Sequence, residues 1–296
     1  MKKQKTVSIK AKLLGVIIPV VIAIVVVLVV AAYQISAGTI KKYSQNLLQS
    51  SVENQASQIE AWLNENLASF QMAKTIIEDL KPSDEELKTI LDGYYGYNSN
   101  YPEGLYVADS TGQLITASES TKKESDVTNS TWYKEGLTRV NMAVGSAYQN
   151  ADGVNVISAS GILNDGSDKV RVISADMTLD RIAIIVNSFI EMNDAEAFLV
   201  DKTSGVILAN RDSSLISQTL GAEGQSHFYQ LTAEKAAEKD YNFATLDGNM
   251  TVFQEVDGTN WLLISYIPTS IVLSDLTQLR NIMIVISVIC IALLCV

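Results

Sequence analysis

The segment STWYKEGL, residues 130–137, sets two aromatic side chains next to each other in a chain that has only three tryptophans. Trp132 and Tyr133 together offer an indole N–H, a phenol hydroxyl and two flat faces. Such groups can enclose a small polar or cationic ligand through hydrogen bonds and cation–π contacts. The alternative is that Trp132 is a core residue, as we expect Trp62 and Trp261 to be. The pair is therefore the first candidate for a binding site.

Asp176 is the second candidate, because it interrupts an otherwise small or apolar strand segment, VRVISADMTL. A carboxylate in such a place is costly unless something pairs with it. The partner is either a ligand or a cation of the chain, Arg171 or Arg181. A further alternative is that Asp176 caps a helix that begins near Leu179, although Asp180 is an equally good cap.

Catalytic and metal chemistry find little support in the rest of the chain. The only histidine, His227, has no second histidine with which to build a metal site. No glycine-rich phosphate loop follows a predicted strand. The turns DGVN and NDGSD lack the acid spacing and the closing glutamate of a calcium loop. We therefore predict that the chain is not an enzyme and that it has no metal ion and no cofactor.

The N-terminus indicates that the candidate site is attached to a membrane. The opening MKKQKTVSIKAK carries five lysines and no acid, and residues 13–33 then contain no charge at all. About 20 apolar residues are enough to cross a bilayer, and lysines favour its cytoplasmic side. We predict a cytoplasmic segment at 1–12 and a retained transmembrane helix at 13–35. Cleavage as a signal peptide near Ala31, Ala32 or Ala37 is the alternative.

A second apolar segment, NIMIVISVICIALLCV, closes the chain. It predicts the beginning of a second transmembrane helix at 279–296 and a longer protein that continues beyond it, with a C-terminal anchor as the alternative. The region between the two spans would then be extracytoplasmic. That region holds 17 of the 22 basic residues and all 33 acidic ones, so we expect no nucleic-acid partner. Cys290 and Cys295 both lie in the second apolar segment, so no disulfide is expected outside the membrane.

A long helix is predicted to continue out of the membrane over residues 36–80. Apolar residues recur there at helical spacing, and neither Pro nor Gly occurs between Gly38 and Pro82. The segment KPSDEELKTIL predicts a second, shorter helix. Its N-cap is Ser83 or Asp84, and acidic residues occupy its first turn, where the helix dipole favours them.

The pattern changes to strand-like alternation from Gly104 onward. LYVADSTGQLITAS reads as strand, turn and strand, and AFLVDKTSGVILANR repeats this design about 90 residues later. DKVRVISADM and TNWLLISYIP are likewise matching strands that close a hairpin. We predict two tandem antiparallel α+β modules, at 81–192 and 193–278. A chance likeness of generic hairpins is the alternative.

The order of these elements, together with YVADSTGQLITAS, TWYKEGL, AYQNADGVNVISAS and RVISADMTLDRI, resembles the extracellular double Cache sensor domain. The resemblance covers roughly residues 33–280. It implies two PAS-like modules along a long N-terminal helix and, most often, a methyl-accepting chemotaxis receptor. It also implies a small-molecule pocket in the membrane-distal module. The implied pocket residues are Ser130, Trp132, Tyr133, Tyr148, Asn150 and Asp176.

This sequence departs from the amino-acid-binding members of that family at three places. Ser130 stands where an arginine would hold the ligand's carboxylate, Ser125 replaces a tyrosine, and Asn150 replaces an aspartate. Asp176, which the resemblance pairs with a ligand ammonium, is retained. We therefore expect a small amine or another uncharged or cationic nitrogenous metabolite in preference to an α-amino acid. The alternative is that Ser130, Thr131 or an arginine elsewhere binds a carboxylate.

Two functions from different classes remain open. In the first, the chain is the input region of a membrane receptor that binds its ligand in the distal module, dimerises along the long helix and acts on cytoplasmic signalling partners. The output would be chemotactic, or else a histidine kinase or a diguanylate cyclase. In the second, the chain is a membrane-tethered binding protein without an output domain. We expect the proximal module to transmit rather than bind, because HFYQL, with Phe228 and Tyr229, is not followed by the helix pattern of TWYKEGL.

Overall fold

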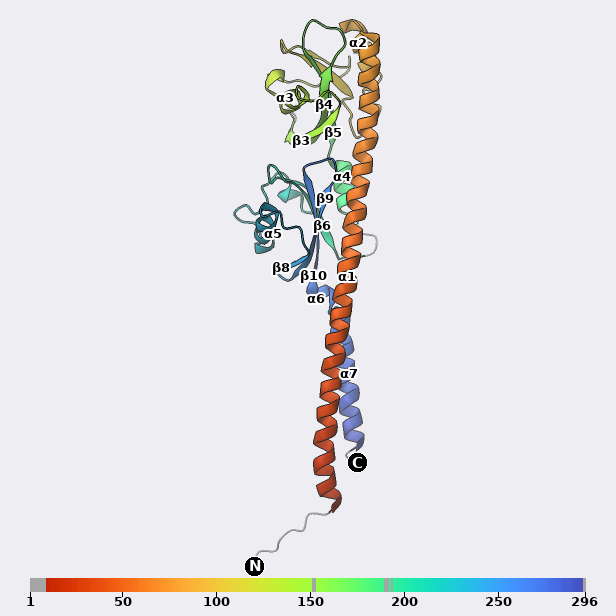
Figure 1. Ribbon diagram of the computed structural model, residues 1–296, viewed down its shortest axis with the longest axis vertical. Helices are drawn as coiled ribbons and strands as arrows, with labels where there is room; N and C mark the ends of the chain where they lie inside the picture. The colour runs from red at the N-terminus through yellow and green to blue at the C-terminus, as the bar shows by residue number, and fades with distance from the viewer. Residues whose placement is uncertain (1–8, 151–152, 189–191, 193, 295–296) are drawn as a thin grey trace, which may run out of the picture.

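The computed structural model describes residues 9–150, 153–188, 192 and 194–294. The molecule is elongated, with one helix along its whole length and two sheets stacked beside that helix (Figure 1). The α+β class and the two antiparallel modules predicted from the sequence are confirmed. Most of the predicted cytoplasmic segment at 1–12 lies outside the described residues, as does Cys295.

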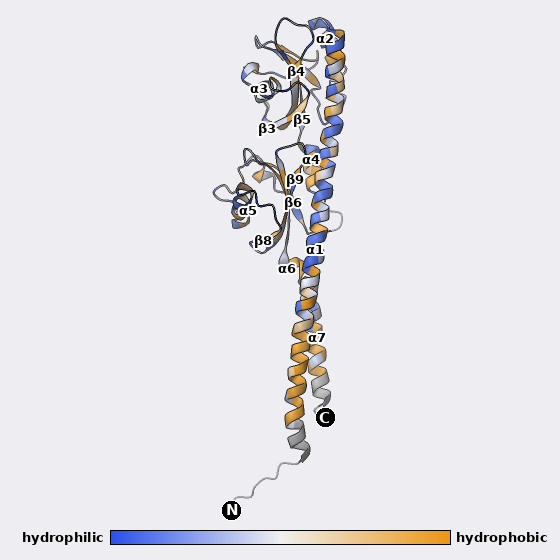
Figure 2. Cartoon of the chain, in the orientation of Figure 1, coloured by the Kyte–Doolittle hydropathy of each residue, from blue (hydrophilic) through white to orange (hydrophobic). Residues whose placement is uncertain are grey.

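Helix α1, Ile9–Leu80, joins the predicted membrane segment and the predicted long helix in 72 unbroken residues. It contains Pro19 and ends where Lys81 adopts a φ of 47° before Pro82, which cannot continue a helix. Figure 2 shows that its lower part is apolar. Among the described residues, α1 is the one helix long and apolar enough to cross a membrane. By length and composition it supports the first predicted span.

Helix α7, Ser274–Leu294, packs against this apolar part of α1 (Figures 1 and 2). Its apolar stretch over the described residues, Leu276–Ile289, is shorter than a full crossing. The second transmembrane helix therefore stays a prediction.

Helix α2, Asp84–Asp92, follows directly after α1 and lies beside the upper end of that helix (Figure 1). Ser83 is its N-cap, and Glu86 completes a capping box by accepting the backbone N–H of Ser83. The two residues satisfy backbone donors that a helix start otherwise leaves unpaired. Ser83, and not Asp84, is therefore the N-cap of α2. The side chain of Asp84 instead pairs with Arg171.

The first sheet has five antiparallel strands in the order β2-β1-β5-β4-β3. The 3-10 turn η1, Val127–Asn129, and helix α3, Thr131–Gly136, lie between β2 and β3, and α4, Asp180–Val186, follows β5. The strands are β1 (Leu105–Asp109), β2 (Leu114–Ile115), β3 (Ala143–Gln149), β4 (Asn155–Leu163) and β5 (Arg171–Thr178).

The second sheet repeats this topology in the order β7-β6-β10-β9-β8. Here η2, Ser213–Leu215, and helix α5, His227–Ala237, take the places of η1 and α3, and α6, Thr269–Val272, leads into α7. The strands are β6 (Glu196–Asp201), β7 (Ile207–Asn210), β8 (Ala244–Leu246), β9 (Asn249–Val256) and β10 (Trp261–Pro268).

This repeat corrects one sequence-based interpretation. Phe228 and Tyr229 stand at the second and third residues of α5, as Trp132 and Tyr133 do in α3. HFYQL therefore begins a helix, and it is the counterpart of TWYKEGL. The sequence does not reveal this helix because its apolar residues show only a weak helical periodicity.

The main core lies between α1 and the faces of both sheets that turn toward it. Side chains alternate across a strand, so Ile173, Ala175 and Met177 of β5 pack in this core, whereas Val172 and Asp176 face away from it. Trp62 and Trp261 are buried in the main core, as expected. The opposite face of the first sheet carries a smaller cluster of aromatic side chains.

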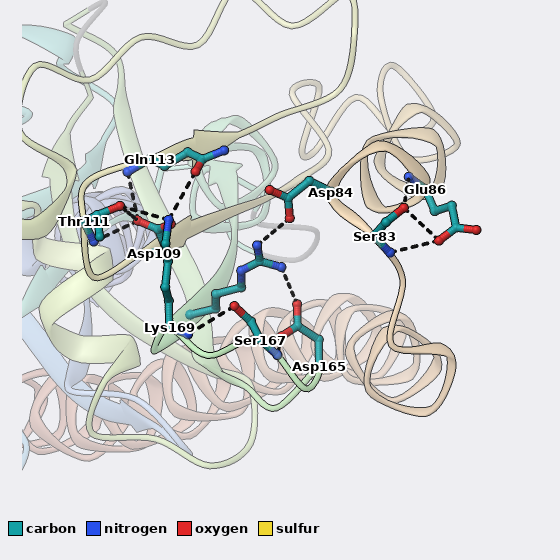
Figure 3. A network of polar contacts seen from close by, with 10 residues as sticks. Ser83, Asp84, Glu86, Asp109, Thr111, Gln113, Asp165, Ser167 and Lys169 are labelled. Carbon is teal, nitrogen blue, oxygen red and sulfur yellow. Dashed lines mark hydrogen bonds and ion pairs between the residues drawn. The ribbon is translucent and has the colours of Figure 1, made fainter.

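A polar network closes the end of the first sheet that is remote from the predicted membrane segment (Figure 3). Arg171 donates one hydrogen bond to Asp165, at 2.7 Å, and another to Asp84 of α2. Asp165 and Arg171 are both buried. The network joins α2, β5 and the turn between β4 and β5, so it ties the helical cap to the sheet.

Acidification is expected to weaken the fold through Asp109, a buried residue at the end of β1 (Figure 3). Burial by itself would raise its pKa, but hydrogen bonds from Lys169, Thr111 and Gln113 lower that pKa to about 2. Because the folded pKa lies below the unfolded value, this stabilisation is complete above about pH 4 and is lost as the pH falls toward 2. Denaturant unfolding between pH 2 and 5 should show a smaller acid dependence for Asp109→Asn than for the native chain.

The matched control for this measurement is Asp180→Asn, which neutralises an exposed carboxylate. It should leave the acid dependence of stability close to that of the native chain. An Asp109→Asn profile that follows the native one across this pH range would show that Asp109 does not carry the effect.

Candidate ligand-binding site

A cavity of about 400 Å³ opens on the face of the first sheet that turns away from α1. Its wall is formed by β3, β4 and β5 and by the irregular segment that runs from β2 to α3. This size falls within the range usual for small-molecule sites. Of the residues predicted from the sequence, Ser130, Tyr148, Asn150 and Asp176 line this cavity.

Asp176 is the centre of a hydrogen-bond network at the cavity wall. Its Oδ1 accepts the hydroxyls of Tyr106 at 2.5 Å, Ser158 at 2.5 Å and Tyr148 at 2.9 Å. The donors come from β1, β4 and β3, and Ser158 is the direct neighbour of Asp176 in the register of β4 with β5. The sheet thus brings three hydroxyl donors from three different strands to one carboxylate.

Lys122 is the cation that pairs with Asp176. Its Nζ lies 2.6 Å from Oδ2 of Asp176 and 4.3 Å from the centre of the Tyr106 ring. The sequence left Arg171 and Arg181 as candidates for this role. Arg171 instead pairs with Asp165 and Asp84, so the assignment to Arg171 is wrong. Capping is also excluded, because α4 begins beyond Asp176, with Leu179 at its N-cap.

The phenols in this network act as proton donors throughout the physiological range. Burial, reinforced by the charge of Asp176, raises the pKa of Tyr106 and of Tyr148 well above the usual value for tyrosine. Both hydroxyls therefore keep the proton that they donate to Asp176.

Trp132 and Tyr133 are buried in the cluster that supports the cavity wall. Trp132 packs edge-on against the ring of Tyr106, at 4.9 Å between ring centres, and its Nε1 donates to Glu124 at 2.9 Å. Glu124 lines the cavity, and burial raises its pKa. The indole of Trp132 lies behind the cavity wall and holds the side chain of Glu124 in position. Direct contact of Trp132 or Tyr133 with a ligand stays a prediction.

Ser130 and Asn150 line the cavity with side chains that already have partners in the chain. The Ser130 hydroxyl donates to the carbonyl of Val127 at 2.6 Å. Oδ1 of Asn150 accepts the backbone N–H of Val154 at 2.9 Å and shapes the turn between β3 and β4. Their roles as ligand contacts also stay predictions.

Comparison with known families identifies the fold that holds this cavity. The family model for the Cache domain, of the double dCache type, matches residues 32–276. The chain belongs to this Cache family. The predicted resemblance is therefore confirmed, and the two sheets are its two Cache modules.

Solved ligand-binding domains share the fold at low sequence identity. The ligand-binding domain of Pseudomonas fluorescens chemoreceptor CtaA in complex with L-isoleucine is 20% identical, with a TM-score of 0.64 over 81% of this chain and 98% of that one. The ligand-binding domain of Mlp24 with asparagine is 16% identical, with a TM-score of 0.64 over 80% and 99%. That of Pseudomonas aeruginosa PAO1 chemoreceptor PctC with GABA is 20% identical, with a TM-score of 0.56 over 76% and 99%. No curated protein sequence matches this chain.

The second Cache module has aromatic side chains where the first has its polar network. Tyr106 pairs with Ser174 in the first sheet and Phe198 with Ile264 in the second, so Phe198 corresponds to Tyr106 and Tyr266 to Asp176. Tyr266 lies 4.4 Å from Phe228 between ring centres, and Phe198 lies 5.1 Å from Tyr229. These rings belong to one aromatic cluster of the second module.

Lys122, Glu124, Tyr106 and Ser158 are the site residues that the sequence did not reveal. The alternation of side chains along a strand could have indicated Tyr106 and Ser158, because both lie on the same face of the sheet as Asp176. Lys122 and Glu124 lie in a segment without regular secondary structure, where no periodicity indicates which way a side chain points.

Proposed function

We propose that this Cache chain senses a small nitrogenous metabolite outside the cell, as the input region of a transmembrane chemoreceptor of the methyl-accepting type. The observation that carries this proposal is the cavity of the first module, with the carboxylate of Asp176 at its wall. A buried carboxylate held by three hydroxyls is a suitable acceptor for an ammonium group. L-isoleucine, asparagine and GABA, named with the related structures, all carry an amino group.

The proposed arrangement places residues 13–35 and 279–296 in the membrane and the region between them outside the cell. The first module, 81–192, is the distal one and binds the ligand. The second, 193–278, transmits the signal. Phe198 and Tyr266, which stand where the first module has Tyr106 and Asp176, support this division because no carboxylate occupies the position of Asp176. Because α1 contacts both sheets and α7, a change in the first module can reach the membrane as a shift between α1 and α7.

A ligand screen on the chain in lipid nanodiscs tests the proposal. Amines, amino acids, organic acids and purines are compared by the rise in melting temperature, since a ligand at 100 times its Kd stabilises the native state by about 2.7 kcal/mol. We expect at least one compound with an amino group to give a rise. Thr178→Trp, which fills the cavity from β5, should abolish that rise.

The matched control is Thr245→Trp, which adds the same ring at an exposed position of the second sheet. It should leave the response unchanged. A response that survives Thr178→Trp but not Thr245→Trp would place the ligand in the second module. Responses to organic acids or purines alone would contradict a nitrogenous ligand held by Asp176.

We also propose that two copies of the chain associate along α1. Met72, Ile76 and Leu80 recur every four residues there, and 67%, 44% and 64% of their surfaces are exposed. Such a stripe can pack against the same stripe of a second helix. With Cys290 and Cys295 replaced by alanine, a cysteine at Met72 should form an oxidative cross-link between two chains in membranes.

A cysteine at Glu238 is the control for this cross-link. Glu238 is exposed and lies at the end of α5, on the side of the second sheet away from α1 (Figure 1). It should give little cross-linked product. Equal yields at the two positions would indicate random collision, and the absence of product from Met72→Cys and from Ile76→Cys would count against this dimer.

A further inference from the structure

We propose that Lys122 is the carboxylate-binding group of the cavity and that the ligand is a zwitterion. On binding, the ligand's ammonium takes the place of Lys122 on Asp176, and the released Lys122 pairs with the ligand's carboxylate. This inference rests on the proposed function of the first module. It reverses the expectation, drawn from the sequence, that a simple amine fits better than an amino acid.

The first step of the argument is that Lys122 already stands where a ligand ammonium would bind. Asp176 accepts three hydroxyls on Oδ1 and the ammonium of Lys122 on Oδ2. The three hydroxyls fully occupy Oδ1, so Oδ2 is the oxygen left for a ligand, and Lys122 stands on it. A second ammonium at Oδ2 would meet the charge of Lys122 at close range. A cationic group can therefore reach Asp176 only if Lys122 moves.

Lys122 is placed so that it can move. It lies between β2 and η1, in a segment without regular secondary structure, and a flexible four-carbon stem carries its charge. In the structure its side chain is only 10% exposed and that of Asp176 only 7%. The ion pair is thus screened little by solvent, and separating the two charges without new partners would be costly.

The charge balance of the exchange selects the class of ligand. A simple amine on Asp176 would leave Lys122 with Glu103 and Glu124, acids of the wall whose carboxylates already accept hydrogen bonds from Ser120 and Trp132. A simple carboxylate on Lys122 would leave two anions to share one cation. A zwitterion gives both Asp176 and Lys122 an opposite charge, so that charges of alternating sign replace the original pair.

The neighbouring side chains leave this role to Lys122. The Ser130 hydroxyl donates to the carbonyl of Val127, and no guanidinium stands at this position. Glu103 and Glu124, which also line the cavity, are acids and would repel a carboxylate. Lys123 lines the cavity too, but it is exposed and therefore more strongly screened. Lys122 thus takes the carboxylate-binding role that an arginine at position 130 would have, although it lies in a different part of the cavity wall.

The test compares ligands that differ by one charge. The probes are the twenty L-amino acids and 4-aminobutyrate, titrated onto the full chain in nanodiscs by calorimetry. For the amino acid that binds most tightly, the methyl ester and the deaminated acid complete a matched series. The native chain should bind the amino acid more tightly than the ester or the acid.

Lys122→Met should reduce the preference for the amino acid over its methyl ester by about ten- to a hundredfold. The amino acid loses its carboxylate partner, and the ester no longer competes with a lysine. A ratio of two affinities is used because general damage to the site would weaken both probes alike. Lys122→Arg should restore the preference, and Lys123→Met should leave it within about threefold of the native value.

The outcomes separate the inference from the proposed function. An unchanged preference in Lys122→Met, or an equal loss in Lys123→Met, would overturn the role of Lys122 while ligand binding itself stands. A native chain that prefers the ester would likewise overturn the zwitterion. If no probe binds but a simple amine from the screen does, the zwitterion is overturned and the proposed function stands. If no compound of either set binds, the proposed function fails, and this inference fails with it.

Discussion

Asp176→Asn is expected to weaken binding of the ligand's ammonium group by about ten- to a hundredfold. A hydrogen bond to a charged group contributes about 1.5 to 3 kcal/mol, and each 1.4 kcal/mol is about tenfold in affinity. Asparagine keeps the size of the side chain but removes the negative charge. The affinity is measured by calorimetry for the tightest ligand from the screen, and far-ultraviolet circular dichroism checks that the variant is folded.

Two controls make this result specific to Asp176. Asp180→Asn removes the same charge from an exposed position four residues away, so it should change affinity by less than about threefold. Tyr148→Phe removes one of the three hydroxyls that Asp176 accepts and should produce a smaller loss than Asp176→Asn. Asp176→Asn with native affinity for an ammonium ligand would show that the cavity binds its ligand through other groups.

Arg171→Met is expected to lower the free energy of unfolding by about 3 to 5 kcal/mol, because it leaves the buried carboxylate of Asp165 without its cation. The side chain of Asp165 is only 2% exposed, whereas that of Asp84 is 48% exposed and can turn to solvent. Denaturant unfolding of the chain in detergent, followed by circular dichroism, measures the loss. This effect should exceed any that comes from a surface ion pair of the same protein.

Lys202→Met provides that comparison, since it breaks the more exposed pair with Glu255 and should cost less than about 1 kcal/mol. A second test adds Asp165→Leu to Arg171→Met. Removing both charges should recover much of the lost stability, because the cost arises from the unpaired carboxylate. If the double variant is no more stable than Arg171→Met, the loss has a different cause, such as poorer packing of β5.

The sequence alone determined the long helix, the short helix after it and the matching hairpins of the two modules, together with their order. Periodic apolar residues, with neither Pro nor Gly among them, define the long helix up to Leu80. In the structure the helix ends there, where Lys81 adopts a positive φ before Pro82. Alternating residues around polar turns define the matching hairpins, so the repeat of two modules was also predictable. These features follow from local backbone preferences, which act between residues only a few positions apart.

Part of the candidate site was predictable for a similar reason. Asp176 stands out because it is a carboxylate in a strand of small and apolar residues, and such a group needs a partner. The need for a partner is a local property, but the identity of that partner is not. Arg171 is closer in the sequence, yet the side chain that meets Asp176 is Lys122, 54 residues away.

Only the tertiary structure decided which charges meet and which side chains face the cavity. Strand register brings Ser158 beside Asp176, and the fold of an irregular segment brings Lys122 to the same carboxylate. The position of α3 turns Trp132 into the cluster behind the wall, where its N–H holds Glu124. These contacts depend on the relative positions of elements that are distant in the chain. The interaction free energy of two buried charges depends on their distance and burial, and not on their separation along the sequence. Only the tertiary structure therefore decides which buried charges pair.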